Sequence, residues 1–492
     1  MFTRRVPVLA LFLLTVLTNF PTQALAAEPL TAGQLADTLD TLLDNHPTAK
    51  RTTVTLKVVD LETGEVLYDR GGNKLLTPAS NLKIYTASAA LDLLGPDYRW
   101  PTEIIAGGAV SRGTCTGDLW IRGFGDPMLD SEQLESIADE LVKTQRLKRV
   151  NGGVRVAINH RWGSVPLKGP GWMWDDDPDY YNMSIRPVML NFNTLDVVAS
   201  PGQKGVKVSL EPKTAWPSVV VKPSTDSNDK GVSFEREPFE ETIYVTGTLE
   251  AGSDPVRETI TMHDPSLWIS AVFKQILIDR GVKFKESESR PSSSVVIGAD
   301  ANSLVTHESK TLAEALKHFL KVSENAVGEM VLLKLAETQT REAVSWPTGV
   351  KVISDWLINT AGLEAGSFRL VDGSGLSRYN LISADSSVKL LAFMKSHKHF
   401  EPFFDGLPIY KVTLPEAETW HGKPLKDYNP ERVFAKPGGM SGVSTISGYI
   451  KTLDGQWLAF SLLGNGYIGS SKPVRDLRNE VWGELVRYKP AD

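Results

Sequence analysis

The sequence predicts an α/β protein in which an antiparallel sheet, built from strands at both ends of the chain, carries helices on both faces and a large, mostly β inserted region. Apolar residues alternate along Val54–Val58, and strand-like segments return between residues 432 and 463. Helical periodicity fills residues 312–336, whereas residues 100–299 read as short strand-like pieces separated by turns. One sheet closed by both ends of the chain, with the insertion outside it, accounts for this order.

Local signals predict the elements of the main domain. Glu62-Thr63-Gly64 supplies the turn of an N-terminal hairpin over residues 54–68. A helix is expected from Ile84 to Leu94, which lack Gly and Pro, and Gly95-Pro96 ends it. Further helices are expected at 312–320, 326–336, 384–395 after the Ser383 cap, and 474–487, and strands at 432–436, 445–451 and 456–463.

Residues 100–299 are expected to form an inserted region with its own core and room for two subdomains. Turn-rich runs such as Gly123-Phe124-Gly125-Asp126-Pro127 interrupt it, and one helix is expected at 265–280, capped by Asp264 and ended by Gly281. The main domain would then consist of residues 27–99 and 300–492. A chain of 492 residues is too long for a single ordinary core, which supports such a division.

Residues 1–26 have the pattern of a signal peptide. Arg4 and Arg5 precede the apolar run Val6–Leu17, and Ala24-Leu25-Ala26 resembles a cleavage site. The run is short for a bilayer span, and a retained membrane anchor is the alternative. Loss of the two arginines would change the formal net charge from −6 to −6 − 2 = −8. We therefore expect an exported protein of the periplasm or cell envelope.

Composition narrows the partners and the chemistry. Hydrophobic residues make up 41% and charged residues 23%, an ordinary globular balance, and no basic excess indicates a nucleic-acid partner. Cys115 is the single cysteine, so no internal disulfide can form. A structural cysteine in a strand is favoured over a catalytic one.

The first candidate for chemistry is Ser80 with Lys83. A serine hydroxyl needs a base to become a nucleophile, and three residues of helix place both side chains on one face. Burial or a second cation would keep the lysine amine neutral enough to act as that base. Alone, the pair is a weak signal and is more often a solvated helix start. Pro78 upstream and the small, apolar helix behind strengthen the catalytic interpretation.

The second candidate is Ser323-Glu324-Asn325, expected in a loop between two helices. The Ser323 hydroxyl could relay a proton between Lys83 and a leaving group, and the Asn325 amide could hold a substrate carbonyl. The alternative is an ordinary N-cap, with Ser323 starting the following helix.

The third candidate is Lys436-Pro437-Gly438-Gly439, after the strand-like Val433-Phe434-Ala435. A lysine beside a glycine pair lets a substrate backbone approach as an added strand. The charge of Lys436 could bind a carboxylate and lower the pKa of Lys83. An edge strand that ends in a turn is the alternative, and Pro437 favours it.

Taken together, the three motifs resemble those of the class C low-molecular-mass penicillin-binding proteins, the D-alanyl-D-alanine carboxypeptidase/endopeptidase group. Their order, Ser-x-x-Lys, Ser-x-Asn and Lys-x-Gly, is that of penicillin-binding proteins and serine β-lactamases. The resemblance covers nearly all of the chain after the leader. It includes Leu76-Thr77-Pro78-Ala79-Ser80-Asn81-Leu82-Lys83, Gly123-Phe124-Gly125-Asp126-Pro127, Trp174-Asp175-Asp176 and Asp372-Gly373-Ser374-Gly375-Leu376-Ser377-Arg378-Tyr379-Asn380.

The resemblance implies a transpeptidase-like domain that acts on peptidoglycan stem peptides and is acylated by β-lactams. Ser80 would form the acyl-enzyme, Lys83 would take its proton and Ser323 would assist transfer to the leaving group. Asn325 would orient the substrate and Lys436 would face a carboxylate. The oxyanion hole would use the backbone N–H groups of Ser80 and Gly439, next to Gly438.

Three residues depart from the family pattern. Pro437 stands where a threonine usually helps to bind the terminal carboxylate, and proline offers neither hydroxyl nor N–H. Gly439 stands where Ser or Thr is usual, and Glu324 replaces the usual Asp. Cleavage of internal cross-links, which needs no terminal carboxylate, would be relatively favoured.

Other signals are weaker. His397 and His399 lack a third metal ligand, and Asp175–Asp177 lack the rest of a calcium loop, so neither a metal nor another cofactor is expected. Trp172 and Trp174 could stack on sugars or pack in a core. In the last helix, four residues at helical spacing predict a docking face: Val474, Leu477, Val481 and Leu485.

Three hypotheses remain from the sequence. The leading one is a D,D-peptidase; the others are a catalytically silent wall-binding homologue, suggested by Pro437 and Gly439, and a β-lactamase, against which the inserted region argues. The expected partners are stem peptides and β-lactams, with weak membrane or wall association open. The sequence leaves the oligomeric state and the diamino acid undecided.

Overall fold

The computed structural model describes residues 25–157, 161–163, 165–202, 205–222, 231–285, 297, 301–415 and 418–490. Nearly all of the predicted leader lies outside the described residues. Its last two residues form strand β1 (Leu25–Ala26), which pairs in parallel with β21 (Glu418–Trp420), itself paired with β22 (Lys423–Pro424). Within the described ranges, no helix is both long enough and apolar enough to cross a bilayer.

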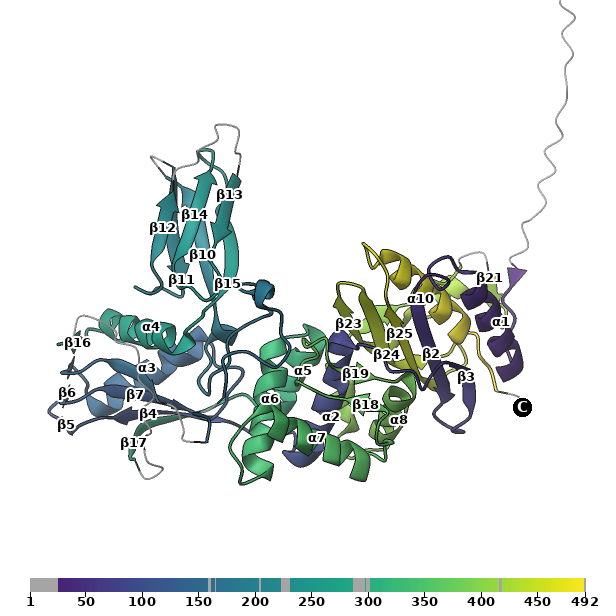
Figure 1. Ribbon diagram of the computed structural model, residues 1–492, viewed down its shortest axis with the longest axis horizontal. Coiled ribbons are helices and arrows are strands. Elements are labelled where there is room, and N and C mark those ends of the chain that lie inside the picture. Colours follow the sequence, from purple (N-terminus) through teal and green to yellow (C-terminus); the bar gives the residue numbers. More distant parts are fainter. Residues whose placement is uncertain are drawn as a thin grey trace, which may run out of the picture.

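A six-stranded antiparallel sheet forms one end of the molecule (Figure 1, right). The N-terminal hairpin β2–β3 lies beside β25, so strands from both ends of the chain close one sheet, as predicted. In spatial order the strands are β20 (Ile409–Lys411), β23 (Glu431–Met440), β24 (Val443–Lys451), β25 (Trp457–Asn465), β2 (Thr53–Asp60) and β3 (Val66–Arg70).

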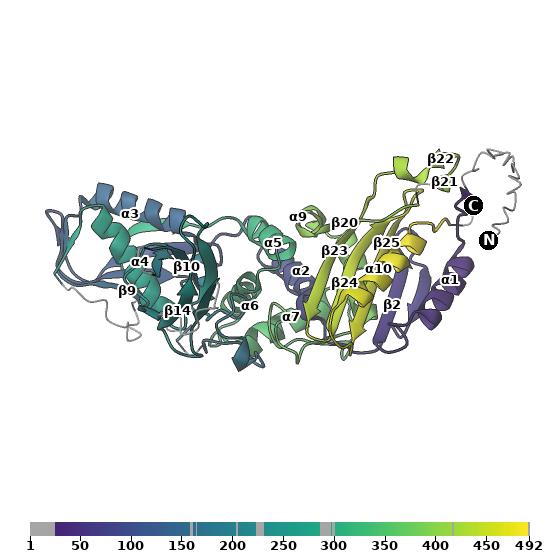
Figure 2. The same cartoon turned by 90° about the horizontal axis from the view of Figure 1, so that it is seen from above.

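Helices cover both faces of this sheet (Figure 2). On one face, α1 (Ala32–Asn45) and α10 (Lys472–Leu485) pack their apolar sides onto the strands. The four spaced residues of the last helix are all buried there, which confirms the predicted docking face. On the other face lie α2 (Lys83–Leu93), α5 (Leu312–Lys321), α6 (Asn325–Gln339), α7 (Trp346–Asn359), α8 (Ala384–Lys395) and α9 (Phe400–Gly406), with the short strands β18 (Phe368–Arg369) and β19 (Leu381–Ile382).

Helix α2 lies in the middle of the second core. Its residues from Lys83 to Leu91 are all buried, because sheet and helices surround it on every side. A single 3₁₀ turn, η1 (Ala79–Leu82), precedes it and carries Ser80. The helix is Ala-rich and has almost no polar face, which is the pattern of a fully enclosed helix.

The inserted region has its own core (Figure 1, left). Helices α3 (Ser131–Gln145) and α4 (Pro265–Asp279) pack beside two four-stranded sheets. One sheet contains β4 (Pro101–Ala106), β7 (Leu119–Gly123), β9 (Val154–Ala157) and β17 (Ser303–Glu308); the other contains β5 (Val110–Ser111), β6 (Thr114–Cys115), β8 (Arg149–Val150) and β16 (Lys283–Phe284). The inserted region thus extends past the predicted boundary at residue 299, because β17 pairs with β4. Cys115 is buried in β6, which agrees with a structural role.

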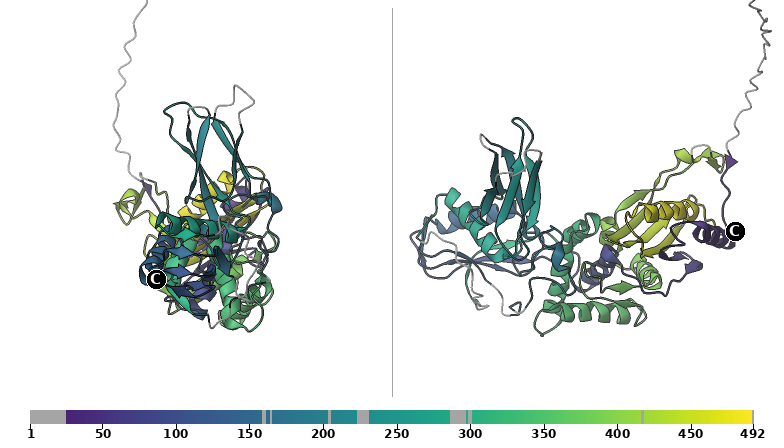
Figure 3. Two further views of the ribbon diagram at one scale, coloured as in Figure 1. Left: turned by 90° about the vertical axis from the view of Figure 1, so that its left-hand side faces the viewer. Right: turned by 45° about the horizontal axis from the view of Figure 1, so that its top comes forward.

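Two three-stranded sheets rise from this region as a projection, here called the finger (Figures 1 and 3). One sheet contains β10 (Thr194–Pro201), β11 (Val206–Glu211) and β15 (Val256–Thr261); the other contains β12 (Val219–Lys222), β13 (Gly231–Glu235) and β14 (Ile243–Thr248). The short 3₁₀ turns η2 (Trp174–Asp176), η3 (Asn191–Asn193) and η4 (Leu425–Asp427) complete the described elements.

The insertion also packs directly on the main domain. Trp162 lies in the helical core and donates a hydrogen bond to Glu337 Oε1 at 3.0 Å, and Arg161 binds the carbonyl oxygens of Glu337 and Thr340. Trp172 packs edge-on against Trp346. Burial of these aromatic rings holds the inserted region against α6 and α7.

Several predictions about helices were incomplete. Helix α4 begins after Asp264 as expected, but it is not the one helix of the inserted region, because α3 is a second, capped by Asp130 and Gln133. Helix α1 was missed although Leu35, Leu39 and Leu43 have helical spacing. Helix α7 was also missed; its Trp346-Pro347 start after Ser345 is a normal first turn.

Candidate active site

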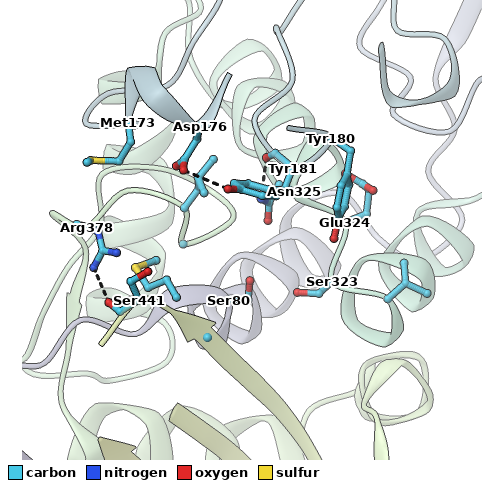
Figure 4. A pocket seen from close by; sticks show the side chains of 15 residues that line it. Ser80, Met173, Asp176, Tyr180, Tyr181, Ser323, Glu324, Asn325, Arg378 and Ser441 are labelled. Carbon is cyan, nitrogen blue, oxygen red and sulfur yellow. Dashed lines mark hydrogen bonds between the residues drawn. The ribbon is translucent and has the colours of Figure 1, made fainter. Parts of the chain in front are cut away.

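A cavity of about 470 Å³ lies where η1, the start of α6, the end of β23 and the inserted region meet. Ser80, Ser323, Asn325 and Gly439 border it, so the structure brings all three predicted motifs to one place. Figure 4 shows the Ser80 and Ser323 side chains close together at its floor. Lys83 and Lys436 are almost completely buried beneath the lining residues.

Ser80 stands at a strained turn. Ala79, immediately before it, has a positive φ of 49°, a conformation that non-glycine residues seldom adopt. Gly375 packs against this turn, and a Cβ at Gly375 would lie 2.0 Å from the Ala79 carbonyl oxygen. The turn presents Ser80 to the cavity while Lys83, one helical turn later, points into the core.

Lys83 Nζ has three oxygen partners. It lies 2.9 Å from Ser80 Oγ, 2.7 Å from Asn325 Oδ1 and 2.8 Å from the carbonyl oxygen of Ser374. The two carbonyl-type oxygens can only accept hydrogen bonds. A neutral amine that donates to both therefore keeps its lone pair free for the Ser80 hydroxyl.

Burial lowers the pKa of Lys83 to about 8, while the negative charges of Asp372, Glu329 and Glu324 partly oppose this shift. The pKa of Lys436 falls further, to about 6, through burial and then through the positive charge of Lys83. Each ammonium disfavours the charged form of the other, so the two buried amines favour a state in which only one of them is protonated. That the charge of Lys436 also lowers the pKa of Lys83 stays a prediction.

Asn325 connects the lysine to the inserted region. Its Nδ2 donates to the Tyr181 carbonyl oxygen at 2.9 Å, which leaves Oδ1 to accept from Lys83. Ser323 has a positive φ of 69°, and Glu324, not Ser323, caps helix α6 by accepting from the Ala326 N–H. The alternative of Ser323 as an ordinary N-cap was therefore wrong, and its side chain borders the cavity.

Lys436-Pro437-Gly438-Gly439 forms part of strand β23, which continues to Met440. The prediction ended this strand at Lys436, with a turn at the proline as the alternative. Residues 436–439 pair with β24 on one side, whereas β20 reaches only Phe434 on the other. Proline is tolerated at such an edge, where its missing N–H costs no ladder bond. The open side of the strand faces the cavity at Gly439.

Asn81 fixes the distance between β23 and the turn that carries Ser80. Its Nδ2 donates to the Lys436 carbonyl oxygen at 2.8 Å, and its Oδ1 accepts from Ser447. Gly438 lets strand β23 lie close to the turn that carries Ser80, since a Cβ at Gly438 would lie 2.2 Å from the Pro78 carbonyl oxygen. At Gly439 a Cβ would meet no atom within 4 Å.

The Asp372–Ser377 loop supplies the third partner of Lys83. Asp372 accepts from the backbone N–H groups of Gly375 and Ser377, and so holds a tight turn. Glu329, fully buried, accepts from the N–H of Ser374 at 2.8 Å; burial and the neighbouring Asp372 raise the pKa of Glu329. The sequence analysis missed Glu329, although it lies four residues after Asn325 on the same helical face.

The far wall of the cavity comes from the inserted region and was also missed. Asp176 and Tyr181 face the cavity, and Tyr181 donates to Asp176 Oδ1 at 3.1 Å (Figure 4). Arg378 stands at its left edge in that view and donates to the Ser441 carbonyl oxygen at 3.1 Å. The sequence runs that contain Asp176 and Arg378 were recognised, but the position of these residues in the cavity was not predicted, because it depends on packing between segments far apart in the chain.

A buried ion pair anchors this wall to the finger. Asp177 lies 2.8 Å from Arg236 Nη2 and 3.3 Å from Lys168 Nζ, and both Asp177 and Arg236 are buried. These charges lower the pKa of Asp177 although burial alone would raise it. The backbone on either side of Asp177 is therefore held in one position.

Asp175–Asp177, His397 and His399 are not gathered into a metal site. In the described ranges, no three His, Cys, Asp or Glu side chains form a group that could hold a metal ion. Trp172 packs on the main domain and donates to Asp372 Oδ2 at 3.0 Å, whereas Trp174 is 67% exposed. The two tryptophans of the motif thus have different environments.

The two adjacent glycines give a matched test of this geometry. Gly438→Ala should lower the free energy of unfolding by about 1–3 kcal/mol, since its Cβ must displace the Pro78 backbone. Gly439→Ala should change it by less than about 0.5 kcal/mol, because its Cβ enters open space. Urea unfolding followed by circular dichroism measures both, and equal losses would contradict the close approach of β23 to the Ser80 turn.

Comparison with known proteins places this geometry in a family. The model of the D-Ala-D-Ala carboxypeptidase 3 (S13) family matches residues 35–482. A D-alanyl-D-alanine carboxypeptidase of Actinomadura sp. (strain R39) is 31% identical over 453 residues, 89% of this chain and 82% of the relative. The D-alanyl-D-alanine carboxypeptidase DacB of Haemophilus influenzae is 24% identical, over 87% of this chain and 90% of the relative.

The fold agrees with this assignment. The crystal structure of penicillin binding protein 4 (dacB) from Haemophilus influenzae has a TM-score of 0.74 at 22% identity, and the match covers 92% of this chain and 99% of that one. The resemblance drawn from the three motifs is confirmed, as is the predicted α/β fold class. The chain belongs to the S13 family of serine D-Ala-D-Ala carboxypeptidases.

Proposed function

We propose that this protein is a serine D,D-peptidase that cleaves peptidoglycan stem peptides through an acyl-enzyme on Ser80. The contact between a buried Lys83 amine and Ser80 Oγ at 2.9 Å carries this proposal. An amine with a pKa of about 8 is an effective base near neutral pH, because an appreciable fraction is unprotonated there. The same acylation would make the protein a target of β-lactams.

The reaction follows from the positions of the groups. Ser80 Oγ attacks the carbonyl carbon of a D-Ala residue and passes its proton to Lys83. The backbone N–H groups of Ser80 and Gly439, both bordering the cavity, would stabilise the developing oxyanion. Ser323 would carry a proton from Lys83 to the leaving amine, so that the peptide bond breaks. Water then hydrolyses the ester and restores Ser80.

The substrate peptide would lie along the open side of β23 as an added strand. Lys436 would meet a carboxylate on the leaving-group side, and Asn325 would orient the peptide while it holds Lys83. A bound carboxylate would raise the pKa of Lys436 and keep it cationic, and that charge would in turn favour neutral Lys83. Because Pro437 replaces a residue with a hydroxyl group, this carboxylate has one hydrogen-bond partner fewer. Cleavage of internal cross-links, which needs no terminal carboxylate, is therefore relatively favoured.

Asp176 and Arg378 suggest which side chain precedes the D-Ala residue that Ser80 attacks. They place an anion and a cation on the border of one cavity, and Tyr181 fixes the carboxylate. A side chain that ends in both an ammonium and a carboxylate, as in a diamino-acid residue of a stem peptide, would pair with both. The site therefore fits a carboxypeptidase and an endopeptidase that share this side-chain pocket.

A catalytically silent wall-binding homologue is the second candidate, because Pro437 and Gly439 depart from the family motif. The complete set of contacts around Lys83 favours the enzyme, since a binding protein needs no neutral amine beside a serine.

The proposed peptidase would be exported through the leader at residues 1–26 and would act in the periplasm or cell envelope. A relative in Dictyostelium discoideum named penicillin-sensitive carboxypeptidase A supports sensitivity to β-lactams.

Labelled penicillin tests the nucleophile. We expect one covalent label per chain of wild type, located on Ser80 by peptide mass spectrometry, and none on Ser80→Ala. Ser441→Ala, which removes another hydroxyl from the cavity border, should keep the label. An unlabelled wild type would support the silent binder, and rapid release of hydrolysed drug would support a β-lactamase.

The pH dependence tests the two lysines. For an amidated substrate without a terminal carboxylate, acylation should rise about tenfold per pH unit and level off above a pH of about 8, where the pKa of Lys83 lies. A substrate with a free carboxylate also needs cationic Lys436, whose pKa is about 6. Its kcat/KM should form a plateau between these values and fall at higher pH. Identical profiles for both substrates would contradict a role for the Lys436 charge.

Substitution of Asp176 and Arg378 tests whether these two residues bind the side chain of the diamino acid. Asp176→Asn and Arg378→Gln should each lower kcat/KM about 10–100-fold for stem peptides with a free diamino-acid terminus, since each removes one charge-assisted hydrogen bond. Peptides with an apolar side chain at that position should be cleaved at unchanged rates. Asp175→Asn, an exposed neighbour outside the cavity, is the matched control. Equal losses on both kinds of peptide would contradict the pairing.

A further inference from the structure

Exposed apolar side chains lie on two segments that border the active-site cavity, where Trp174 follows the lining residue Met173 and Tyr379 follows the lining residue Arg378. Met173, Trp174 and Tyr379, here called the aromatic rim, are 43%, 67% and 60% exposed. Gly171 joins the two segments, because a Cβ there would lie 2.5 Å from Tyr379 Cδ2. An exposed tryptophan and an exposed tyrosine next to one cavity are unusual unless they contact a ligand or partner.

The rim is held in place by the surrounding structure. Asn182 Nδ2 donates to the Met173 carbonyl oxygen at 3.0 Å, and the turn η2 continues into the buried Asp177. On the other segment, Asn380 donates to Asp372 and the Arg369 side chain binds the Tyr379 carbonyl oxygen at 2.8 Å. The rings are thus presented on fixed backbone, as preorganised binding surfaces are.

The direction of the substrate indicates what reaches this rim. In the proposed function the leaving-group carboxylate would lie toward Lys436, so the acyl part of the peptide would run along the lining residues Gly439, Met440 and Ser441. Ser441 is bonded to Arg378, the residue before Tyr379, and Met173 stands above Arg378 in Figure 4. The part of the stem peptide that is attached to the polymer would then leave the cavity at the aromatic rim.

We propose that the aromatic rim binds the glycan strand to which the stem peptide is attached, with Trp174 and Tyr379 stacking on the apolar faces of its sugar rings. This inference rests on the proposed function. Two residues separate the diamino acid from the sugar, a reach of about 7 Å in extended chain. Trp174 and Asp176 lie within the single 3₁₀ turn η2, so Trp174 is within one helical turn of the proposed side-chain pocket.

The chemistry of the rim fits a neutral sugar. Aromatic side chains with one exposed face bury the C–H groups of a pyranose without a large entropy cost, since they have few rotatable bonds. The exposed Asp175 beside Trp174 can accept hydrogen bonds from hydroxyl groups. The protein would then prefer polymeric wall material, or fragments that retain sugar, over free peptide.

The test compares one pentapeptide with and without its disaccharide, using the full chain. Wild type should cleave the sugar-bearing form with a kcat/KM about tenfold higher. Trp174→Leu and Tyr379→Leu should lower this ratio toward one and leave cleavage of the bare peptide unchanged. Trp174→Tyr should keep most of the ratio, because it keeps an aromatic face. Ile468→Ala, at a fully exposed apolar residue in another loop, should not alter the ratio.

Two results would overturn the inference. One is a wild-type ratio of one; the other is a ratio that Trp174→Leu leaves unchanged, including the case in which both substrates slow equally. Failure of the proposed function is distinguishable, since wild type would then cleave neither form and take no penicillin on Ser80.

Discussion

The buried Lys83 amine is the interaction on which the rest of the site depends. Two of its partners, Asn325 Oδ1 and the Ser374 carbonyl oxygen, can only accept, so a neutral amine directs its lone pair at Ser80. Burial supplies the neutral form, and three carboxylates nearby limit the shift. The amine is consequently weakly basic compared with an exposed lysine and still basic enough to take a proton from serine.

Each partner of Lys83 is positioned by a different part of the chain. Asn325 is fixed by Tyr181 of the inserted region, and Ser374 by Glu329 of helix α6. Ser80 is fixed by a strained turn that Gly375 and β23 enclose. The inserted region therefore supports the contacts of Lys83 through one backbone carbonyl, in addition to forming the far wall of the cavity, and the ion pair of Asp177 with Arg236 extends this support into the finger.

The sequence predicted the parts of the site that lie in short motifs. Ser80 and Lys83 are related by helical spacing, and Asn325 and Lys436 lie in equally recognisable runs, so local patterns located them. It could not predict the positions of Asp176 and Arg378 in the cavity or the pairing of Lys83 with Ser374, because these depend on packing between segments far apart in the chain. The sheet closed by both ends was predicted from alternation, whereas α3 was missed because its apolar stripe is diluted by charged residues.

Direct titration of the Lys83 amine tests the account most closely. Lysine side chains labelled with ¹³C at Cε can be followed by NMR as the pH changes, and the resonance lost in Lys83→Arg identifies the residue. A midpoint near pH 8, well below that of exposed lysines, is the result we predict for the folded protein. A midpoint above 10 would mean that the amine stays charged beside Ser80, and it would contradict the proposed mechanism.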